Sequence, residues 1–203
     1  LIHRNRIYLD RMCDVGLMPK DLAIEYGFTG PCLRASGVDY DVRKDFPYLI
    51  YDRLDFDVPV GEKGDNYDRY LVRMEEIRQS LRMIRQCFKQ LPGGPVNAPN
   101  WQVVHPPKSE VYDTIEGMIA QFELVFRGPK IPRGEAYGFV EGGNGELGFY
   151  LVSDGRGGPY RLHVRAPCFA LMQGLPHMLK GGMLADIIPT FDSINMIGGE
   201  LDR

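Results

Sequence analysis

Cysteine and histidine are the residues of this chain best suited to hold a metal ion or to carry out nucleophilic and acid–base chemistry, and they are scattered along it. They are Cys13, Cys32, Cys87, Cys168, His3, His105, His163 and His177. No two cysteines form a CxxC pair, and no two histidines have a spacing that places them on one face of a helix. The pattern predicts free thiols in a reducing compartment, structural or exposed histidines, and no metal or organic cofactor held by this chain.

Residues 143–148 (GNGELG) match the glycine-rich pattern G-x-G-x-x-G, which binds dinucleotides when it joins a strand to a helix. Here the pattern lies between two predicted strands, so we interpret it as a β-turn. Ser36 and Ser153 lack the G-x-S-x-G context in which a serine becomes the nucleophile of a hydrolase. The residues therefore predict no catalytic side chain and no nicotinamide-dinucleotide site on this chain.

Acidic, basic and aromatic side chains alternate between residues 34 and 70. The aspartates are Asp39, Asp41, Asp45, Asp52, Asp55, Asp57, Asp65 and Asp68, and the arginines are Arg34, Arg43, Arg53 and Arg69. Their spacing lacks the register of a calcium-binding loop. We expect a polar, ion-paired and aromatic surface, carried by a long irregular segment over residues 28–64. Irregular segments of this length are uncommon inside compact domains and are usually functional.

The elements that position these residues are mostly helices. Apolar spacing, caps and breakers predict helices over residues 1–13, 19–26, 65–91, 109–126, 169–175 and 177–188, and strands over 136–140, 147–153 and 160–165. The fold class is therefore α+β, mainly α, with a small antiparallel β-meander. We expect two parts: residues 1–135, helical with the irregular segment, and residues 136–203, with the meander, C-terminal helices and a tail.

The longest predicted helix, residues 65–91, carries both an apolar stripe and a charged one. The apolar residues recur at spacings of three and four: Leu71, Met74, Ile77, Leu81, Ile84 and Phe88. Arginines and glutamates are interleaved with them: Arg73, Arg78, Arg82, Arg85, Glu75 and Glu76. The charged residues allow two interpretations, a solvated polar face or a face that pairs with a partner protein.

Composition excludes several classes of protein. The chain has 203 residues, 44% hydrophobic and 25% charged, with a formal net charge of −3, which is typical of an ordinary globular domain. There is no basic excess of the kind that nucleic-acid binding requires. No apolar run approaches the roughly 20 residues of a membrane span, so any membrane association is expected through partners. The start at Leu1 favours a fragment of a longer chain.

Several longer motifs resemble a known family. They are residues 34–44 (RASGVDYDVRK), 55–61 (DFDVPVG), 67–71 (YDRYL), 75–80 (EEIRQS), 150–155 (YLVSDG), 183–186 (MLAD) and 199–203 (GELDR). Together they are similar to the family of the D subunit of respiratory complex I, the proton-pumping NADH–quinone oxidoreductase. The resemblance covers the whole chain and corresponds to roughly the second half, the C-terminal half, of the family's chain.

The resemblance implies a fold like that of the nickel–iron hydrogenase large subunit, a helical bundle with smaller α+β parts. It also implies a core subunit of the peripheral arm that helps form the quinone-reduction cavity and couples electron transfer to proton translocation. Expected partners are quinone, the neighbouring subunit that holds the terminal 4Fe–4S cluster, the C subunit of the peripheral arm, and the membrane arm through partners. The expected location is peripheral, on the cytoplasmic side of a bacterial inner membrane or the matrix side in mitochondria.

The same resemblance assigns roles to the C-terminal tail. The residues expected to line the quinone cavity are Asn195, Met196, Ile197 and Gly198, and those expected to anchor the tail by ion pairs are Glu200, Asp202 and Arg203. The family usually has an aspartate where this chain has Asn195, and a neutral amide carries no proton. Asp192, three residues earlier, is a candidate for the missing carboxylate.

Two alternatives remain open. A nickel–iron hydrogenase needs cysteine thiolates, including a CxxC pair near the C-terminus, and residues 169–203 contain no cysteine. A structural, large-subunit-like component of a related membrane-bound hydrogenase-type complex, without a redox site of its own, is compatible with the sequence. So is a subunit whose quinone pocket has decayed. The type of quinone and the electron donor are left open.

Overall fold

The structure is a computed structural model that describes residues 2–129 and 131–202. The chain forms two compact units, each discontinuous in sequence. The first comprises Leu1–Gln90, Phe139–Gly148 and Val164–Arg203, and the second comprises Leu91–Gly138 and Phe149–His163. The boundary expected between residues 135 and 136 falls inside a strand, because the meander contributes residues to both units.

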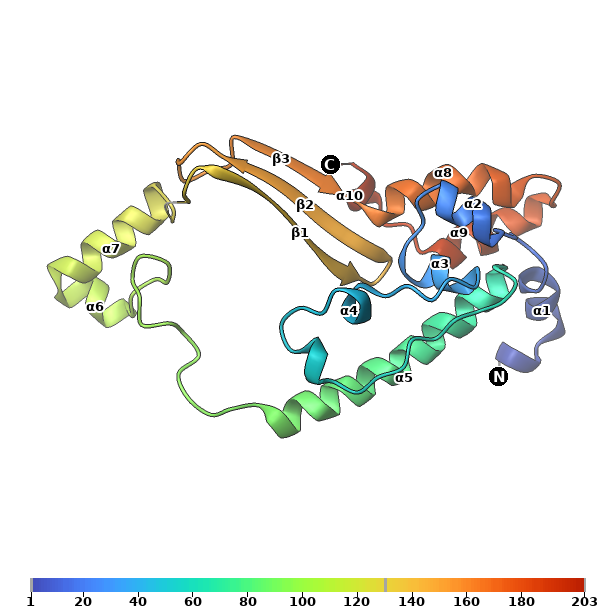
Figure 1. Ribbon diagram of the computed structural model, residues 1–203, viewed down its shortest axis with the longest axis horizontal. Coiled ribbons are helices and arrows are strands. Elements are labelled where there is room, and N and C mark those ends of the chain that lie inside the picture. The colour runs from blue at the N-terminus through green and yellow to red at the C-terminus, as the bar shows by residue number, and fades with distance from the viewer. Residues whose placement is uncertain (1, 130, 203) are drawn as a thin grey trace. The chain divides into compact units, whose positions relative to one another are not determined.

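The first unit holds most of the helices (Figure 1). They are the 3-10 helices η1 (Ile2–Arg4), η2 (Tyr51–Arg53) and η3 (Leu184–Asp186), and the α-helices α1 (Arg6–Met12), α2 (Lys20–Glu25), α3 (Gly30–Ala35), α4 (Val42–Asp45), α5 (Asn66–Gln90), α8 (Pro167–Leu179), α9 (Ile187–Ile194) and α10 (Gly198–Leu201). In the second unit, α6 (Lys108–Asp113) packs against α7 (Ile115–Phe126).

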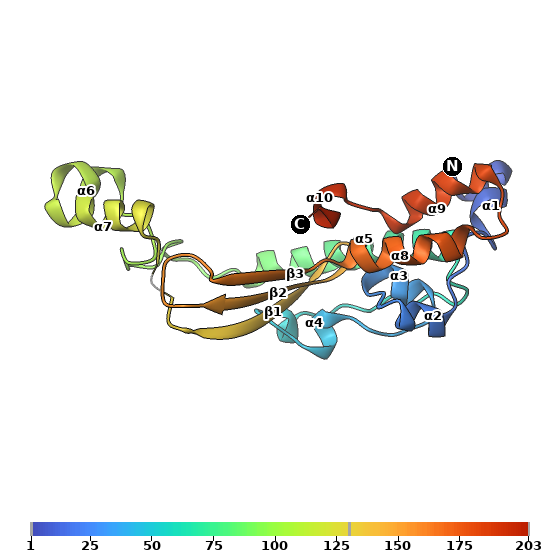
Figure 2. The same cartoon turned by 90° about the horizontal axis from the view of Figure 1, so that it is seen from above.

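The sheet has three strands in the order β1-β2-β3, visible in both views of the ribbon (Figures 1 and 2). They are β1 (Gly134–Gly142), β2 (Gly145–Ser153) and β3 (Arg161–Arg165). The predicted meander and the predicted turn over residues 143–148 are confirmed, because Gly143 and Asn144 join β1 to β2. The α+β, mainly α class is confirmed as well.

The irregular segment expected over residues 28–64 is a wrong prediction in part, since it contains α3, α4 and η2. α3 begins after Thr29, with Pro31 in its first turn, where the missing N–H costs no hydrogen bond. α4 begins after Asp41, whose carboxylate accepts from the backbone N–H of Arg43. These helices have six and four residues, too short to show an apolar period.

The expected helix over residues 109–126 is two helices. Thr114 lies between α6 and α7, and its hydroxyl accepts a hydrogen bond from the backbone N–H of Gly117. The same hydroxyl donates to the carbonyl of Glu110 at 2.8 Å. Thr114 therefore caps a new helix, which the continuous apolar spacing did not reveal.

Two prolines that were expected to bound helices lie inside them. Pro176 is within α8, and His177 consequently lies in the last turn of that helix rather than in the first turn of another. Pro189 is the third residue of α9, where a backbone N–H has no intrahelical acceptor. The helix expected over residues 177–188 is therefore wrong, because the chain leaves α8 after Leu179 and starts α9 at Ile187.

The core of the first unit joins helices from the two ends of the sequence. Its buried residues are Met18, Ala23, Phe28, Cys32, Leu33, Leu171, Met178 and Ile194. α8 approaches closely at Gly174, where an added Cβ would lie 2.5 Å from the Phe28 ring. A smaller cluster of Leu54, Phe56 and Met83 packs the segment after η2 against α5. Among the described helices, none is both long and apolar enough to cross a membrane.

Candidate functional site

The C-terminal tail leaves α9 through a left-handed residue. Asn195 has φ 54° and ψ 52°, a conformation that asparagine tolerates better than most residues. Its backbone N–H donates to the carbonyl of Asp192 at 3.0 Å, which closes the helix. The chain then continues through Met196 and the extended Ile197 into α10. The turn at Asn195 therefore sets the direction of all the residues that follow.

Asn195 is held by a reciprocal pair of amide bonds with Asn144, at the tip of the β1–β2 hairpin. The Asn195 side-chain NH2 donates to Oδ1 of Asn144 at 2.8 Å. The Asn144 NH2 donates back to the Asn195 carbonyl at 2.9 Å and lies 3.2 Å from the sulfur of Cys168. Asn144 is buried. The Asn195 amide therefore fixes the tail in place and has no proton to transfer.

The far end of the tail is held at the N-terminus of α8. A carboxylate oxygen of Glu200 accepts from the backbone N–H of Cys168 at 3.1 Å. An acidic group is stabilised at a helix N-terminus, where backbone N–H groups lack internal acceptors. Burial, followed by the neighbouring Glu200, raises the pKa of the Cys168 thiol. This thiol is thus protonated near neutral pH and is a poor nucleophile.

The remaining tail residues differ in exposure. Met196 packs against the core of the first unit, whereas Ile197 is 50% exposed and Gly198 is exposed. The tail therefore offers an apolar side chain, Ile197, on a backbone fixed on both sides. Asp202 is exposed, and Glu200 is held by a backbone N–H rather than by a basic side chain. The expected anchor Arg203 lies outside the described residues.

α9 itself is fixed by a buried guanidinium. Arg69 of α5 donates through Nε to the Ser193 hydroxyl at 2.9 Å and through Nη1 and Nη2 to the carbonyls of Gly64 and Gly16, both at 2.7 Å. It also donates to Oδ1 of Asn66 at 2.6 Å. Burial lowers the pKa of Arg69 to about 10, so it stays charged at neutral pH. These acceptors are neutral, and they hold the base of the tail against α5.

Asp192 and Asn195 lie in different surroundings. Asp192 lines a cleft of about 500 Å³ between α1, α5 and α9, together with Tyr8, Tyr70 and Arg73. The side chain of Asn195 is bonded instead to the hairpin tip. A carboxylate at position 192 is therefore not positioned to do what an aspartate at position 195 would do.

The hairpin that carries Asn144 is tied to α3 and α5 by a buried ion cluster. Arg34 donates to Glu76 at 3.0 Å and to Glu141 at 3.0 Å, and its guanidinium lies 3.6 Å from Asp41. Asp41 is bound by Arg43 as well, at 2.5 Å. The surface expected for the charged residues around position 40 is thus wrong, because Arg34 and Asp41 are fully buried.

The carboxylates of this cluster have shifted pKa values. Burial raises the pKa of Glu141, because the charge of Arg34 only partly offsets the loss of solvent. At Asp41, burial acts in the same direction but is outweighed by the guanidinium groups of Arg43 and Arg34, so its pKa is lowered. No pattern in the sequence reveals this cluster, since Glu141 is 107 positions from Arg34.

Asn144 and Arg69 were also missed. Asn144 sits in the glycine-rich pattern that we interpreted as a turn, and nothing in the sequence connects it with Asn195, 51 residues away. Arg69 is part of the YDRYL motif, where an arginine among aromatic residues was a signal that could have been followed.

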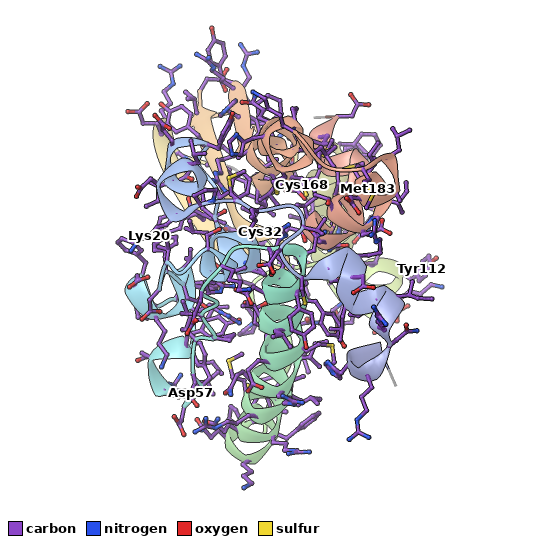
Figure 3. The ribbon with its side chains drawn as sticks, turned by 90° about the vertical axis from the view of Figure 1, so that its right-hand side faces the viewer. Lys20, Cys32, Asp57, Tyr112, Cys168 and Met183 are labelled. Carbon is purple, nitrogen blue, oxygen red and sulfur yellow. The ribbon has the colours of Figure 1, made fainter. Side chains whose placement is uncertain are left out.

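The cysteines carry no further chemistry. All four are free, and Cys32 and Cys168 lie inside the first unit, whereas Lys20 and Asp57 lie at its margin (Figure 3). Within residues 2–129 and 131–202, no three histidine, cysteine or acidic residues gather in a way that could hold a metal ion.

The geometry can be set beside known proteins. A family model described as the 49 Kd subunit of the respiratory-chain NADH dehydrogenase matches residues 1–203. The chain belongs to this family. The family resemblance seen in residues 34–44, 67–71 and 199–203 is confirmed.

The relatives of this member of the 49 Kd family bear one name. The D subunit of NADH-quinone oxidoreductase of Myxococcus xanthus (strain DK1622) is 58% identical over 203 residues, which cover 100% of this chain and 49% of the relative. The protein of the same name from Pelobacter propionicus is 56% identical over 203 residues, with 100% and 50% covered. That from Leptospira biflexa is 51% identical over 202 residues, with 100% and 50% covered. The chain thus spans about half the length of these relatives.

Proposed function

We propose that this chain forms part of the wall of the quinone-reduction cavity in the peripheral arm of a proton-translocating NADH–quinone oxidoreductase. The observation that carries the proposal is the tail, where an exposed apolar side chain, Ile197, stands on a backbone fixed at Asn195 and at Glu200. Quinone sites are largely apolar, with a few polar groups in fixed positions. A rigid apolar wall is what such a site needs from a chain that supplies no redox group.

The division of labour follows from the residues present. The quinone and a 4Fe–4S cluster on a neighbouring subunit would supply the redox chemistry. Met196, Ile197 and Gly198 would shape the wall, and Asn195 would hold it without moving a proton. The proposed partners are the cluster-bearing subunit, the C subunit of the peripheral arm and the membrane arm through other subunits. The proposed location is peripheral, on the cytoplasmic or matrix side of the membrane.

The test uses Ile197→Phe in the assembled complex. A larger side chain at an exposed wall position narrows the cavity, so quinone reduction should fall about tenfold and quinone-site inhibitors should bind more weakly. Reduction of an artificial acceptor by the donor module should stay unchanged. Ile188→Phe is the matched control, since Ile188 of α9 is also an exposed isoleucine.

Each outcome decides between functions. A fall in both activities, with loss of assembled complex, would make the tail a structural element, as in a hydrogenase-type component without a redox site. An unchanged quinone activity and inhibitor affinity would show that the tail does not face the cavity.

A further inference from the structure

α5 of the first unit has three distinct faces. One face points into the unit and holds Arg69, Val72, Glu76, Gln79 and Met83. A second face carries Leu71, Glu75, Arg78, Arg82, Arg85 and Lys89. The third face carries Tyr70, Met74, Ile77, Leu81, Ile84 and Phe88. All three series advance by three and four residues, so each stays on one side of the helix.

The apolar face is the one turned away from the core. Ile77 is 54% exposed, Leu81 and Ile84 are each 49% exposed, and Phe88 is 77% exposed. The buried face is instead largely polar, because it supplies Arg69 and Glu76 to the networks described above. The solvated polar face that the sequence suggested is therefore partly wrong, since several of its members bind inside the unit.

The apolar face is continuous with a cleft at its N-terminal end. The cleft between α1, α5 and α9 is lined by Ile7, Tyr8, Met12, Tyr70 and Pro189, and it has a volume of about 500 Å³. Figure 3 views the unit with α1 on one side of α5 and the segment carrying Asp57 on the other. The Asp57 side is occupied, because Arg82 binds Asp57 at 2.9 Å.

We propose that this face seats one amphipathic helix from the half of the relatives' chain that these 203 residues do not include. The alternating spacing from Tyr70 to Phe88 is that of a helix–helix seam, into which a second helix places its own apolar side chains. The seam is about 27 Å long, which a helix of about 18 residues spans. The relatives contain about as many residues again beyond the matched region, since this chain covers 49% of the Myxococcus xanthus protein.

Charge selects this occupant over a second copy. Residues 77–90 contain Arg78, Arg82, Arg85 and Lys89 and no acidic residue. Arg78 and Arg82 have carboxylate partners on this chain. Arg85 and Lys89 flank the seam, are exposed, and have no partner among the residues that the structure describes. Two copies would bring basic flanks together, whereas a helix with an acidic flank at this end would complement them.

The test co-expresses this chain with the unmatched half of the Myxococcus xanthus relative as a separate tagged chain. We expect the two to co-purify, and Leu81→Glu to reduce recovery of the complex at least tenfold, because a carboxylate would be buried in the seam. Leu71→Glu is the matched control, an exposed leucine on the charged face of the same helix. Circular dichroism of each variant checks that the helix content is retained.

A photo-crosslinking amino acid at position 81, and in a second protein at position 71, identifies the occupant. Crosslinks from position 81 to the unmatched segment, absent from position 71, would support the proposal. Crosslinks to a second copy or to another subunit of the complex would overturn it, as would failure of the unsubstituted chains to co-purify.

Discussion

The two units differ in where they place their apolar side chains. In the first unit, apolar residues from α2, α3, α8 and α9 form a closed core, and buried charges are matched by hydrogen bonds. In the second unit, the apolar stripe of α7 faces solvent: Ile115, Met118, Ile119, Phe122 and Phe126 are all more than half exposed. The first unit is thus organised around its own interior, and the second carries little interior of its own.

This contrast shows that a similar apolar period can serve opposite purposes. Helices α5 and α7 both have apolar residues at spacings of three and four, and in both the stripe is exposed. α5 is nevertheless well anchored, because its buried face is built from polar groups whose partners lie on other elements. The amount of polar pairing, more than the apolar stripe, distinguishes the two units.

The largest effect that would test this contrast is expected from Arg69→Met. The substitution leaves the carbonyls of Gly16 and Gly64 and the side chains of Asn66 and Ser193 short of donors inside the protein. The free energy of unfolding should fall by about 3 kcal/mol or more. Urea unfolding followed by circular dichroism measures it, with the exposed Arg85→Met as control. A loss as small as the control's would mean that polar pairing does not hold the first unit.

The ion cluster offers an intermediate, pH-dependent effect. The folded pKa of Glu141 lies above the ordinary value of 4.5. A group with a raised pKa contributes stability below its unfolded pKa and loses that contribution as the pH rises through its folded pKa. Stability should therefore decline over this window, starting just above pH 4.5, in the unsubstituted chain and decline less in Glu141→Gln. Parallel profiles, measured by urea unfolding at several pH values, would contradict the assignment.

Asp41 acts in the opposite sense and serves as the internal comparison. Its folded pKa lies below the ordinary value of 3.8, so its contribution is present above that value and is lost as the pH falls through the folded pKa. The two carboxylates thus affect different pH windows, and the Glu141 effect can be separated from general acid unfolding.

The smallest effect is expected in the second unit. Phe122 is 59% exposed, and its ring contacts Phe126 on the same helix. Phe122→Ala should lower the free energy of unfolding by less than about 1 kcal/mol, because little area is buried there. The matched substitution in the first unit, Phe28→Ala, removes a buried ring and should cost about 3 kcal/mol or more. Equal losses at the two sites would remove the distinction between the units.

The sequence predicted the elements that depend on local pattern. The helix over residues 65–91 and the meander were found because each has a long period and clear breakers. The split at Thr114 and the short α3 were missed because single capping residues decided them. Which face of α5 points inward could not be predicted, since both its apolar and its polar residues recur with a helical period.

The candidate site was predictable only in part, and only through the family resemblance. Residues 195–198 and 200–203 were singled out by their similarity to the family's closing pattern. Their supports could not be found this way, because Asn144 and Cys168 come from a hairpin tip and a helix start that are distant in sequence. Proximity in the folded chain is the information that a single sequence lacks.

The reciprocal amide pair between Asn144 and Asn195 has a thermodynamic consequence. Because each side chain bonds to the other residue, the arrangement of the tail and that of the hairpin tip are linked equilibria. Linkage is symmetric, so any molecule that favours one arrangement of the tail favours the matching arrangement of the hairpin tip by the same free energy. Occupancy beside Ile197 would therefore be detectable as slower amide hydrogen exchange at the hairpin tip, in residues that the bound molecule does not touch.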